Sequence, residues 1–453
     1  MKRKLFDHLS TTHIILLSFI VAILLGSTLL ALPISSATGE AVPFIDALFT
    51  ATTSVCVTGL VTLSTVSAWS PFAQVVILFL IQIGGLGIIT IMTGVMLSFH
   101  KRIGMGGRFL LQDAFNLNSS SGIIGFIERV LVGTFVVEGI GALLCMTVLV
   151  PEYGGKGIWM SVFHAVSAFC NAGMDIIAED SLCGYALNPM INLVTSALII
   201  LGGIGYIVWW DVLHVLKDVK KRKWRCFQGL TLHSKIALST TAILLAAGTA
   251  AFFIFEYHNP LTLEGLTFFD KMQMAFFQSV TTRTAGFASI PQQDLTNASA
   301  MVSLFLMFIG GSPVGTAGGV KTVTIAVLFM SAAATIQNKE EADLFQRRIA
   351  KQAISKAAAV VSMSFIIMFV STVLLSAVTN GDALDIVYET VSATATVGLT
   401  RNLTPELNLW GKLIIICTMY LGRVGPISLA IAFSTKKENR NIIKNPTEDI
   451  SVG

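Results

Sequence analysis

Long hydrophobic runs alternate with short polar connections along the whole chain. Each run is close to, or longer than, the ~20 residues that a helix needs to cross a ~30 Å hydrocarbon core. The runs cover residues 14–32, 73–99, 130–150, 189–215, 236–255, 301–336, 357–378 and 409–433. The pattern therefore predicts eight membrane-spanning helices. The sixth run is too long for one ordinary span, and glycine and proline interrupt it, so we expect a broken helix there.

The composition agrees with a membrane protein and excludes an ordinary soluble domain. Of the 453 residues, 54% are hydrophobic and 12% are charged, and the mean hydropathy is +0.76. A soluble domain carries about 25% charged residues. A signal peptide is the alternative interpretation of the first run, because Lys2, Arg3 and Lys4 precede it. The first run also belongs to the repeat described below, which favours a span.

Basic residues gather in every second connection. Of the 30 Lys and Arg residues, 22 precede the first run or follow the second, fourth, sixth and eighth runs. Short basic connections remain on the cytoplasmic side of a membrane. The pattern predicts a multi-pass protein of the bacterial plasma membrane with both termini in the cytoplasm.

Four short segments in the remaining, outward connections repeat one pattern. Each is rich in Ser, Thr and Ala and ends in a glycine, and these glycines, Gly59, Gly173, Gly286 and Gly398, are separated by 114, 113 and 112 residues. Each following run carries a glycine motif, at 84–87, 202–205, 310–315 and 422–425. Helix packing explains glycines in a membrane helix, but it does not explain one register in four copies. The predicted repeats are 1–108, 109–226, 227–350 with a broken second span, and 351–453 with a cytoplasmic tail.

Each repeat is predicted to form a helix, a half-length re-entrant helix, an exposed loop and a second helix. A helix of about 12 residues is too short to cross the bilayer. Non-helical backbone at membrane depth is tolerated only where it is buried in protein or lines water. The predicted fold is therefore an all-α membrane protein with four tandem membrane–pore–membrane repeats around a pseudo-fourfold central pore.

The ends of the four re-entrant segments are candidates for a potassium selectivity filter. Backbone carbonyls can replace the hydration oxygens of K⁺, and glycine lets the backbone turn its carbonyls inward. The negative ends of the half-helices favour a cation in the cavity. The residues predicted to bind K⁺ are Val57, Thr58, Gly59, Asn171, Ala172, Gly173, Thr284, Ala285, Gly286, Thr396, Val397 and Gly398. Arg283 is expected to anchor the third strand from behind, because a positive charge in the path would repel K⁺.

Four motifs resemble those of a known family. They are TSVCVTGL (53–60), SAFCNAG (167–173), TTRTAGF (281–287) and ATVGLT (395–400). With them the chain resembles the Trk/Ktr/HKT superfamily of potassium transporters over nearly its whole length. It is most similar to the Ktr membrane subunits, because it starts directly with the repeat. The resemblance implies potassium uptake, with sodium dependence and the coupling of the flux left open.

The resemblance also implies a gate below the filter. In the family, an intramembrane loop occupies the position of the broken sixth run, and an arginine of the last span lies beside it. The corresponding residues are Gly310, Gly311, Ser312, Pro313, Gly315, Thr316, Gly318, Gly319 and Arg423. A phosphate-binding loop is excluded, because Val320 stands where Walker A requires a glycine before Lys321. A purely structural role for Arg423 remains the alternative, and Glu138 is expected to be structural.

Partners and cofactors are expectations of the resemblance. It implies a homodimer on a cytoplasmic ring of RCK-type subunits, with ATP or ADP bound to that ring. No cofactor is expected on this chain, whose substrate would be K⁺, with Na⁺ left open, and no nucleic acid partner is expected. An enzyme is disfavoured, because the sequence offers no nucleophile–base pair or metal-ligand set. A secondary transporter is the main competing hypothesis, since broken helices fit it as well.

Overall fold

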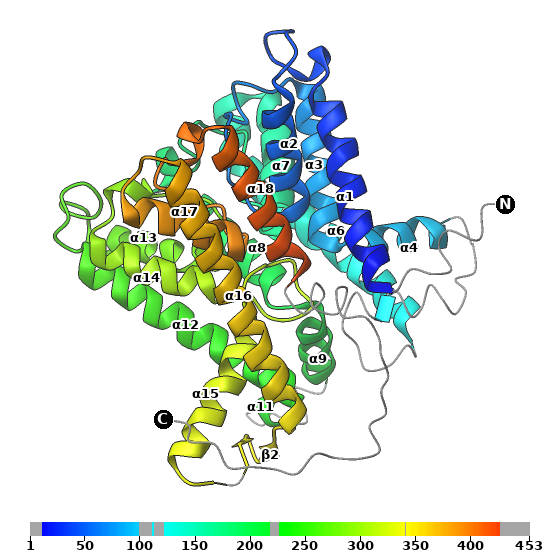
Figure 1. The fold of residues 1–453 in the computed structure, drawn as a ribbon, viewed down its shortest axis with the longest axis vertical. Helices are drawn as coiled ribbons and strands as arrows, with labels where there is room; N and C mark the ends of the chain where they lie inside the picture. Colours follow the sequence, from blue (N-terminus) through cyan, green and yellow to red (C-terminus); the bar gives the residue numbers. More distant parts are fainter. Residues whose placement is uncertain (1–10, 99–110, 113–121, 218–225, 340, 426–453) are drawn as a thin grey trace.

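The computed structural model describes residues 11–98, 111–112, 122–217, 226–339 and 341–425. Within these ranges nearly all regular structure is helical, apart from one two-stranded hairpin. The prediction of an all-α protein is confirmed (Figure 1). The predicted tail and the basic residues 101–108 lie outside the described residues, and the repeat boundaries at 108, 226 and 350 stay a prediction.

Four long helices match the first, third, fifth and seventh hydrophobic runs. Each is long and apolar enough to cross a membrane. They are α1 (Thr11–Leu30), α6 (Ile123–Tyr153), α12 (Leu232–Glu256) and α16 (Lys351–Val378). Their outward faces expose large apolar side chains such as Leu25, Leu143, Ile243 and Phe369. Continuous apolar surface of this kind is suited to lipid rather than to water.

The helices that match the even-numbered runs are interrupted or short. They are α3 (Pro71–Leu86) with α4 (Ile88–Ser98), α8 (Pro189–Gly203) with α9 (Tyr206–Lys217), α14 (Asn297–Phe308) with α15 (Thr322–Ile336), and α18 (Leu409–Val424). The broken sixth run is confirmed. The second and fourth runs, which are predicted to be membrane spans, are broken as well, and α8 and α9 bend by 100°. The breaks fall at Gly87 and Gly205, whose φ angles of 84° and 93° do not continue a right-handed helix.

Four half-length helices lie between each long helix and the interrupted helix that follows it. They are α2 (Phe44–Cys56), α7 (Gly155–Cys170), α13 (Phe268–Thr281) and α17 (Ala383–Ala395). Each packs on an interrupted helix of the unit before it, so that α7 contacts α3, α13 contacts α8, and α17 contacts α14. The contact of α2 with α18 closes the circle between the first unit and the last. The four half-length helices therefore surround one common axis.

The interrupted helices start with the same kind of N-cap. Ser70, Asn188, Thr296 and Asn408 precede α3, α8, α14 and α18, and each side-chain oxygen accepts a hydrogen bond from a backbone N–H in the first turn. Such a cap is worth about 1 kcal/mol. It fixes where the chain re-enters a helix after each loop that follows a half-length helix.

The remaining elements are short. A four-residue helix, α11 (Cys226–Gly229), and the hairpin of β1 (Asp343–Leu344) and β2 (Arg347–Arg348) lie with α15 at one end of the molecule (Figure 1). Among the described residues, 3-10 turns lie in the loops at Pro33–Ser35, Cys183–Tyr185, Gln292–Asp294 and Thr404–Glu406. The loops that follow the half-length helices lie on one side of the molecule. This side is called the loop face.

Candidate functional site

Each half-length helix is followed by a residue in the left-handed conformation. Val57, Asn171, Thr284 and Thr396 have φ angles of 55°, 59°, 66° and 51°, and each stands two residues before a predicted filter glycine. Residues other than glycine rarely adopt a positive φ angle. In three units this residue is the C-cap at which the helix stops, whereas in the third unit Thr284 follows the end of the helix by three residues. The same left-handed turn occurs in one register in all four units.

The four glycines form a closed ring. In each strand, the glycine faces the carbonyl oxygen of the residue before the next glycine. The facing pairs are Gly59 with Ala172, Gly173 with Ala285, Gly286 with Val397, and Gly398 with Thr58. A Cβ atom on Gly59 or on Gly173 would lie 2.6 Å from the facing oxygen, and the other two pairs leave less room. All twelve predicted filter residues thus lie in four strands that meet at one point.

The ring needs glycine for two independent reasons. The φ angles of Gly59, Gly173, Gly286 and Gly398 are 100°, 64°, 84° and 98°, a region that costs other residues about 1–2 kcal/mol. A Cβ at any of them would also collide with backbone of a neighbouring strand. The backbones therefore approach closely enough for their carbonyl oxygens to act together on one ion.

Hydroxyl groups hold the strands to their helices. Thr53 Oγ1 accepts from Gly59 N at 2.9 Å, Ser392 Oγ accepts from Gly398 N at 3.0 Å, and Ser167 Oγ accepts from Met174 N at 3.1 Å. In the third unit, Thr281 Oγ1 donates to Phe287 O at 2.6 Å. These hydroxyl residues are not among the site residues predicted from the sequence. Their signal is a Ser or Thr five or six residues before each glycine.

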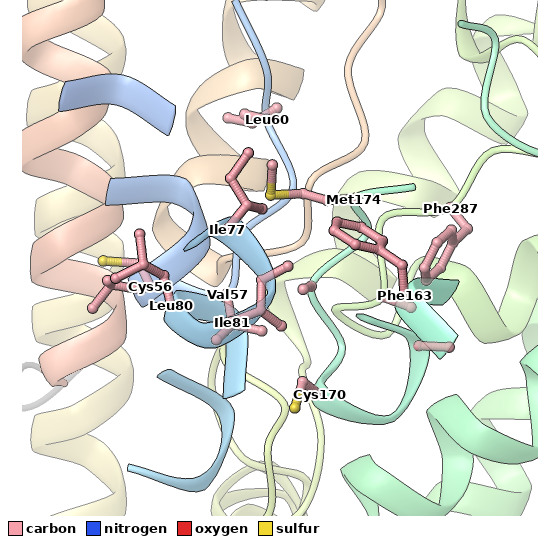
Figure 2. Close-up of a cluster of buried hydrophobic side chains, with 14 of the residues drawn as sticks. Cys56, Val57, Leu60, Ile77, Leu80, Ile81, Phe163, Cys170, Met174 and Phe287 are labelled. Atoms are coloured by element: carbon pink, nitrogen blue, oxygen red, sulfur yellow. The ribbon is translucent and has the colours of Figure 1, made fainter. Parts of the chain in front are cut away.

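Apolar side chains fill the space behind the strands (Figure 2). Ile77 and Ile81 of α3 pack with Val57, and Phe163 of α7 belongs to the same buried cluster as Phe287 of the third unit. Tightly packed side chains leave little freedom for the strands they support. The ring is therefore held from behind by packing as well as by hydrogen bonds.

The segment between α14 and α15 is a loop whose ends meet. Gly310 N donates to Val320 O at 3.0 Å, and Val320 N donates to Phe308 O at 3.1 Å. All loop residues predicted to gate the pore lie between these two points: Gly310, Gly311, Ser312, Pro313, Gly315, Thr316, Gly318 and Gly319. Ser312 and Thr322 hydroxyls share a hydrogen bond of 2.9 Å across the base of the loop.

The loop lies directly against the filter strands. Thr316 Oγ1 donates to Phe169 O, at the end of α7, at 3.0 Å. A Cβ on Gly318 would lie 2.6 Å from Ala395 O and would overlap the side chain of Thr396. The loop therefore contacts the second and fourth strands on the side opposite the loop face.

The loop also pairs with the break between α8 and α9. Ser312 N donates to Gly203 O at 2.8 Å, Thr316 N donates to Gly202 O at 3.1 Å, and Tyr206 N donates to the loop at Val314 O at 2.9 Å. The backbone groups freed by the 100° bend are thus satisfied by the loop, as buried backbone groups must be. This pairing explains why the fourth run is broken.

Arg423 of α18 joins the loop to the first unit. Its guanidinium donates to Thr316 O at 2.7 Å and to Gly84 O at 2.5 Å. Lys321 donates to Ala317 O at 2.5 Å and is thus paired within the loop. A cavity of about 960 Å³ lies here and is lined by Arg423, Lys321, the loop and the glycines of α3. Two positive charges therefore border the cavity below the ring.

Arg283 and Glu138 are buried away from the ring. Arg283 donates to Thr241 O of α12 at 3.3 Å and to Gly310 O at 3.0 Å. These two hydrogen bonds tie the start of the third filter strand to α12 and to the first residue of the loop. This position agrees with the prediction that Arg283 anchors the strand from behind. Glu138 accepts from Gln82 at 3.2 Å, which confirms a structural hydrogen bond.

Replacing Arg283 with methionine is expected to lower the stability of the protein by about 2 kcal/mol or more, because two buried carbonyls lose a charged donor. The measurement is the midpoint of thermal unfolding in detergent. Arg348→Met is the matched control, since that side chain is 78% exposed and pairs only at the surface. Equal midpoints for the two variants would contradict the anchoring role.

A model of the TrkH family, described as cation transport proteins, matches residues 2–445. The chain is a member of the TrkH family. The resemblance found in the sequence is thereby confirmed, as is the prediction of a cation transporter rather than an enzyme.

Two relatives match this chain over almost their full length. The potassium/sodium uptake protein NtpJ of Enterococcus hirae is 42% identical to this chain, and the aligned region covers 100% of this chain and 99% of NtpJ. The Ktr system potassium uptake protein B of Bacillus subtilis is 40% identical to this chain, and the aligned region covers 97% of this chain and 96% of that protein. The crystal structure of the potassium transporter TrkH from Vibrio parahaemolyticus superposes with a TM-score of 0.74 at 17% identity, covering 96% of this chain and 87% of that one. That similarity shows the shared fold, and the chain is a multi-pass membrane protein.

Proposed function

We propose that this chain carries potassium ions across the bacterial plasma membrane through the ring of four glycines. The observation that carries the proposal is the closed set of glycine–carbonyl pairs on one axis, with backbone turns in one register. Rings of backbone carbonyls replace the hydration shell of K⁺ without a fixed charge. In each strand, three consecutive residues would bind the ion. They begin at Val57, Asn171, Thr284 and Thr396 and end at the following glycine.

The names of the relatives support the same substrate. One is a potassium/sodium uptake protein and another is a potassium uptake protein of a Ktr system. Sodium therefore enters the proposal as a second ion or as a required co-ion. The two outcomes differ in whether sodium competes with potassium or accelerates its uptake.

The loop between α14 and α15 is proposed to gate the pore. Support comes from its position against two filter strands and from its attachment through Arg423 to α18 and to Gly84. A charged side chain that holds a loop across the path can be released only by breaking charge-assisted hydrogen bonds. The gate would open when the loop leaves the ring.

The remaining parts of the proposal concern orientation and partners. We propose that the loop face is extracellular, that both termini are cytoplasmic, and that the chain works as a homodimer on a cytoplasmic RCK-type ring. ATP or ADP would bind to that ring and not to this chain. The Ktr system names of the relatives support a partner subunit, and the basic connections support the orientation.

The test is rubidium uptake and potassium-limited growth in a bacterium that lacks its own potassium uptake systems. The chain would be expressed with and without an RCK-type partner. We expect growth to be restored, and restored more strongly with the partner. A well-inserted protein that restores neither growth nor rubidium uptake in either case would contradict potassium transport.

A further inference from the structure

Glu389 is a buried carboxylate in the middle of α17 for which the proposed function has so far given no role. Its exposed fraction is 0%. The ion pairs found among the described residues belong to other carboxylates, those of Glu341, Asp385 and Asp46. A buried carboxylate is costly unless hydrogen-bond donors satisfy it. The identity of its donors therefore indicates what it does.

Both donors come from the segment that follows the fourth glycine. Thr400 Oγ1 donates to Glu389 Oε2 at 2.7 Å, and Thr404 Oγ1 donates to Glu389 Oε1. Leaving a buried carboxyl group without its hydrogen-bond partners costs about 1–3 kcal/mol. The carboxylate thus ties the chain that leaves the ring back to the helix that precedes it.

The same helix also holds the chain on its way into the ring. Ser392 lies three residues after Glu389 and so on the same face of α17. Its hydroxyl accepts from Gly398 N at 3.0 Å, and its backbone oxygen accepts from Val397 N at 2.9 Å. Gly398 therefore lies between two attachments to one helix face.

We propose that Glu389 is a positioning residue that fixes the fourth filter strand and thereby sets the preference for potassium over sodium. The proposal rests on the proposed function, because it assigns a task to the same ring. The fully buried carboxylate does not contact the ion itself. It acts through Thr400 and Thr404 on the position of the Gly398 backbone, which borders Gly59 and Thr58 of the first strand.

No carboxylate stands at the equivalent position in the other three units. The residues nine positions before the glycines are Thr50, His164, Phe277 and Glu389. Thr50 Oγ1 is a buried hydroxyl without a hydrogen-bond partner, and the His164 ring bonds to Thr195. The first unit uses another carboxylate, Asp46, which lies at the start of α2 and accepts from Thr62. The fourth strand is thus the one whose geometry depends on Glu389.

The experiment measures the sodium concentration that halves rubidium uptake, together with the maximal rubidium rate and the amount of protein in the membrane. Glu389→Ala and the double variant Thr400→Val/Thr404→Val should each lower that concentration at least about tenfold, since each removes both of these buried side-chain hydrogen bonds. Glu389→Gln should stay within about threefold of the wild type, because an amide can accept from one threonine and donate to the other. Glu406→Gln, which alters an exposed carboxylate in the same segment, is the matched control.

If Glu389 acted directly through a negative charge, the variants would follow the opposite order in their sensitivity to sodium. Glu389→Gln would then equal Glu389→Ala, and the threonine double variant, which keeps the charge, would equal the wild type; that result would overturn the proposal. If Glu389→Ala does not reach the membrane, the threonine double variant decides by itself. Failure of the proposed function would be seen in the wild-type chain as an absence of rubidium uptake, whereas failure of the Glu389 proposal leaves wild-type uptake intact and the double variant unchanged.

Discussion

Replacing Gly286 with alanine is expected to reduce rubidium uptake at least about tenfold, because the added Cβ collides with neighbouring strands of the ring, beyond the ~1–3 kcal/mol that strained left-handed backbone costs by itself. The φ angle of Gly286 is 84°. Its new Cβ would collide with the carbonyl oxygen of Val397 and would lie 3.1 Å and 3.2 Å from the Cα atoms of Gly173 and Gly398. The neighbouring strands would have to move apart. Gly286→Asp, which adds a carboxylate at the same point, should also destroy the preference for potassium.

The control for this variant is Gly265→Ala. Gly265 has a φ angle of 78°, close to that of Gly286, but no atom lies within 4 Å of an added Cβ. Gly265→Ala therefore carries a similar backbone strain without the collision, and uptake should stay near the wild-type value. Unchanged uptake in Gly286→Ala at normal membrane levels would contradict the assignment of the ring as the filter.

Deleting residues 310–319 is expected to raise rubidium uptake roughly tenfold. An effect of this size is typical of the coupling between two sites in a protein. The deletion joins Ile309 directly to Val320. These two residues already form a parallel β-bridge, so their Cα atoms are near the ~4.8 Å spacing of paired strands and need little movement to reach 3.8 Å. Helices α14 and α15 can therefore keep their places while the loop below the ring is removed.

A milder variant tests the same gate without shortening the chain. Arg423→Gln leaves the loop in place but removes the charged donor to Thr316 O and Gly84 O. Uptake should rise, by less than in the deletion. Wild-type or lower uptake in both variants, with normal amounts of protein in the membrane, would contradict the gating role and favour a structural role for Arg423.

Much of the site could be located from the sequence because its signal is periodic. The spacing of the four glycines and the hydrophobic runs around them gave the twelve strand residues, which the structure brings together. The left-handed turns at Val57, Asn171, Thr284 and Thr396 could not be predicted as a set, because valine and threonine rarely adopt positive φ and asparagine, which does so more readily, stands in only one of the four. Side-chain hydrogen bonds from the end of the preceding helix hold three of them there, through the hydroxyls of Thr53, Ser167 and Ser392.

The break between α8 and α9 shows the limit most clearly. Residues 189–215 form one apolar run, and a glycine pair inside such a run is common in membrane helices that simply pack closely. The bend becomes stable because a loop more than 100 residues later supplies partners for the freed backbone at Gly202, Gly203 and Tyr206. Nothing local in the run encodes that loop.

The sequence by itself determined the membrane class, the long helices and the fourfold register, because hydrophobic length and repeated spacing are properties of the chain alone. The tertiary structure decided which interrupted helices break, which carbonyls Arg423 and Arg283 bind, and that Glu389 is tied to Thr400 and Thr404. These features arise between segments distant in sequence or through side-chain geometry. They exist only once the four units have closed around one axis.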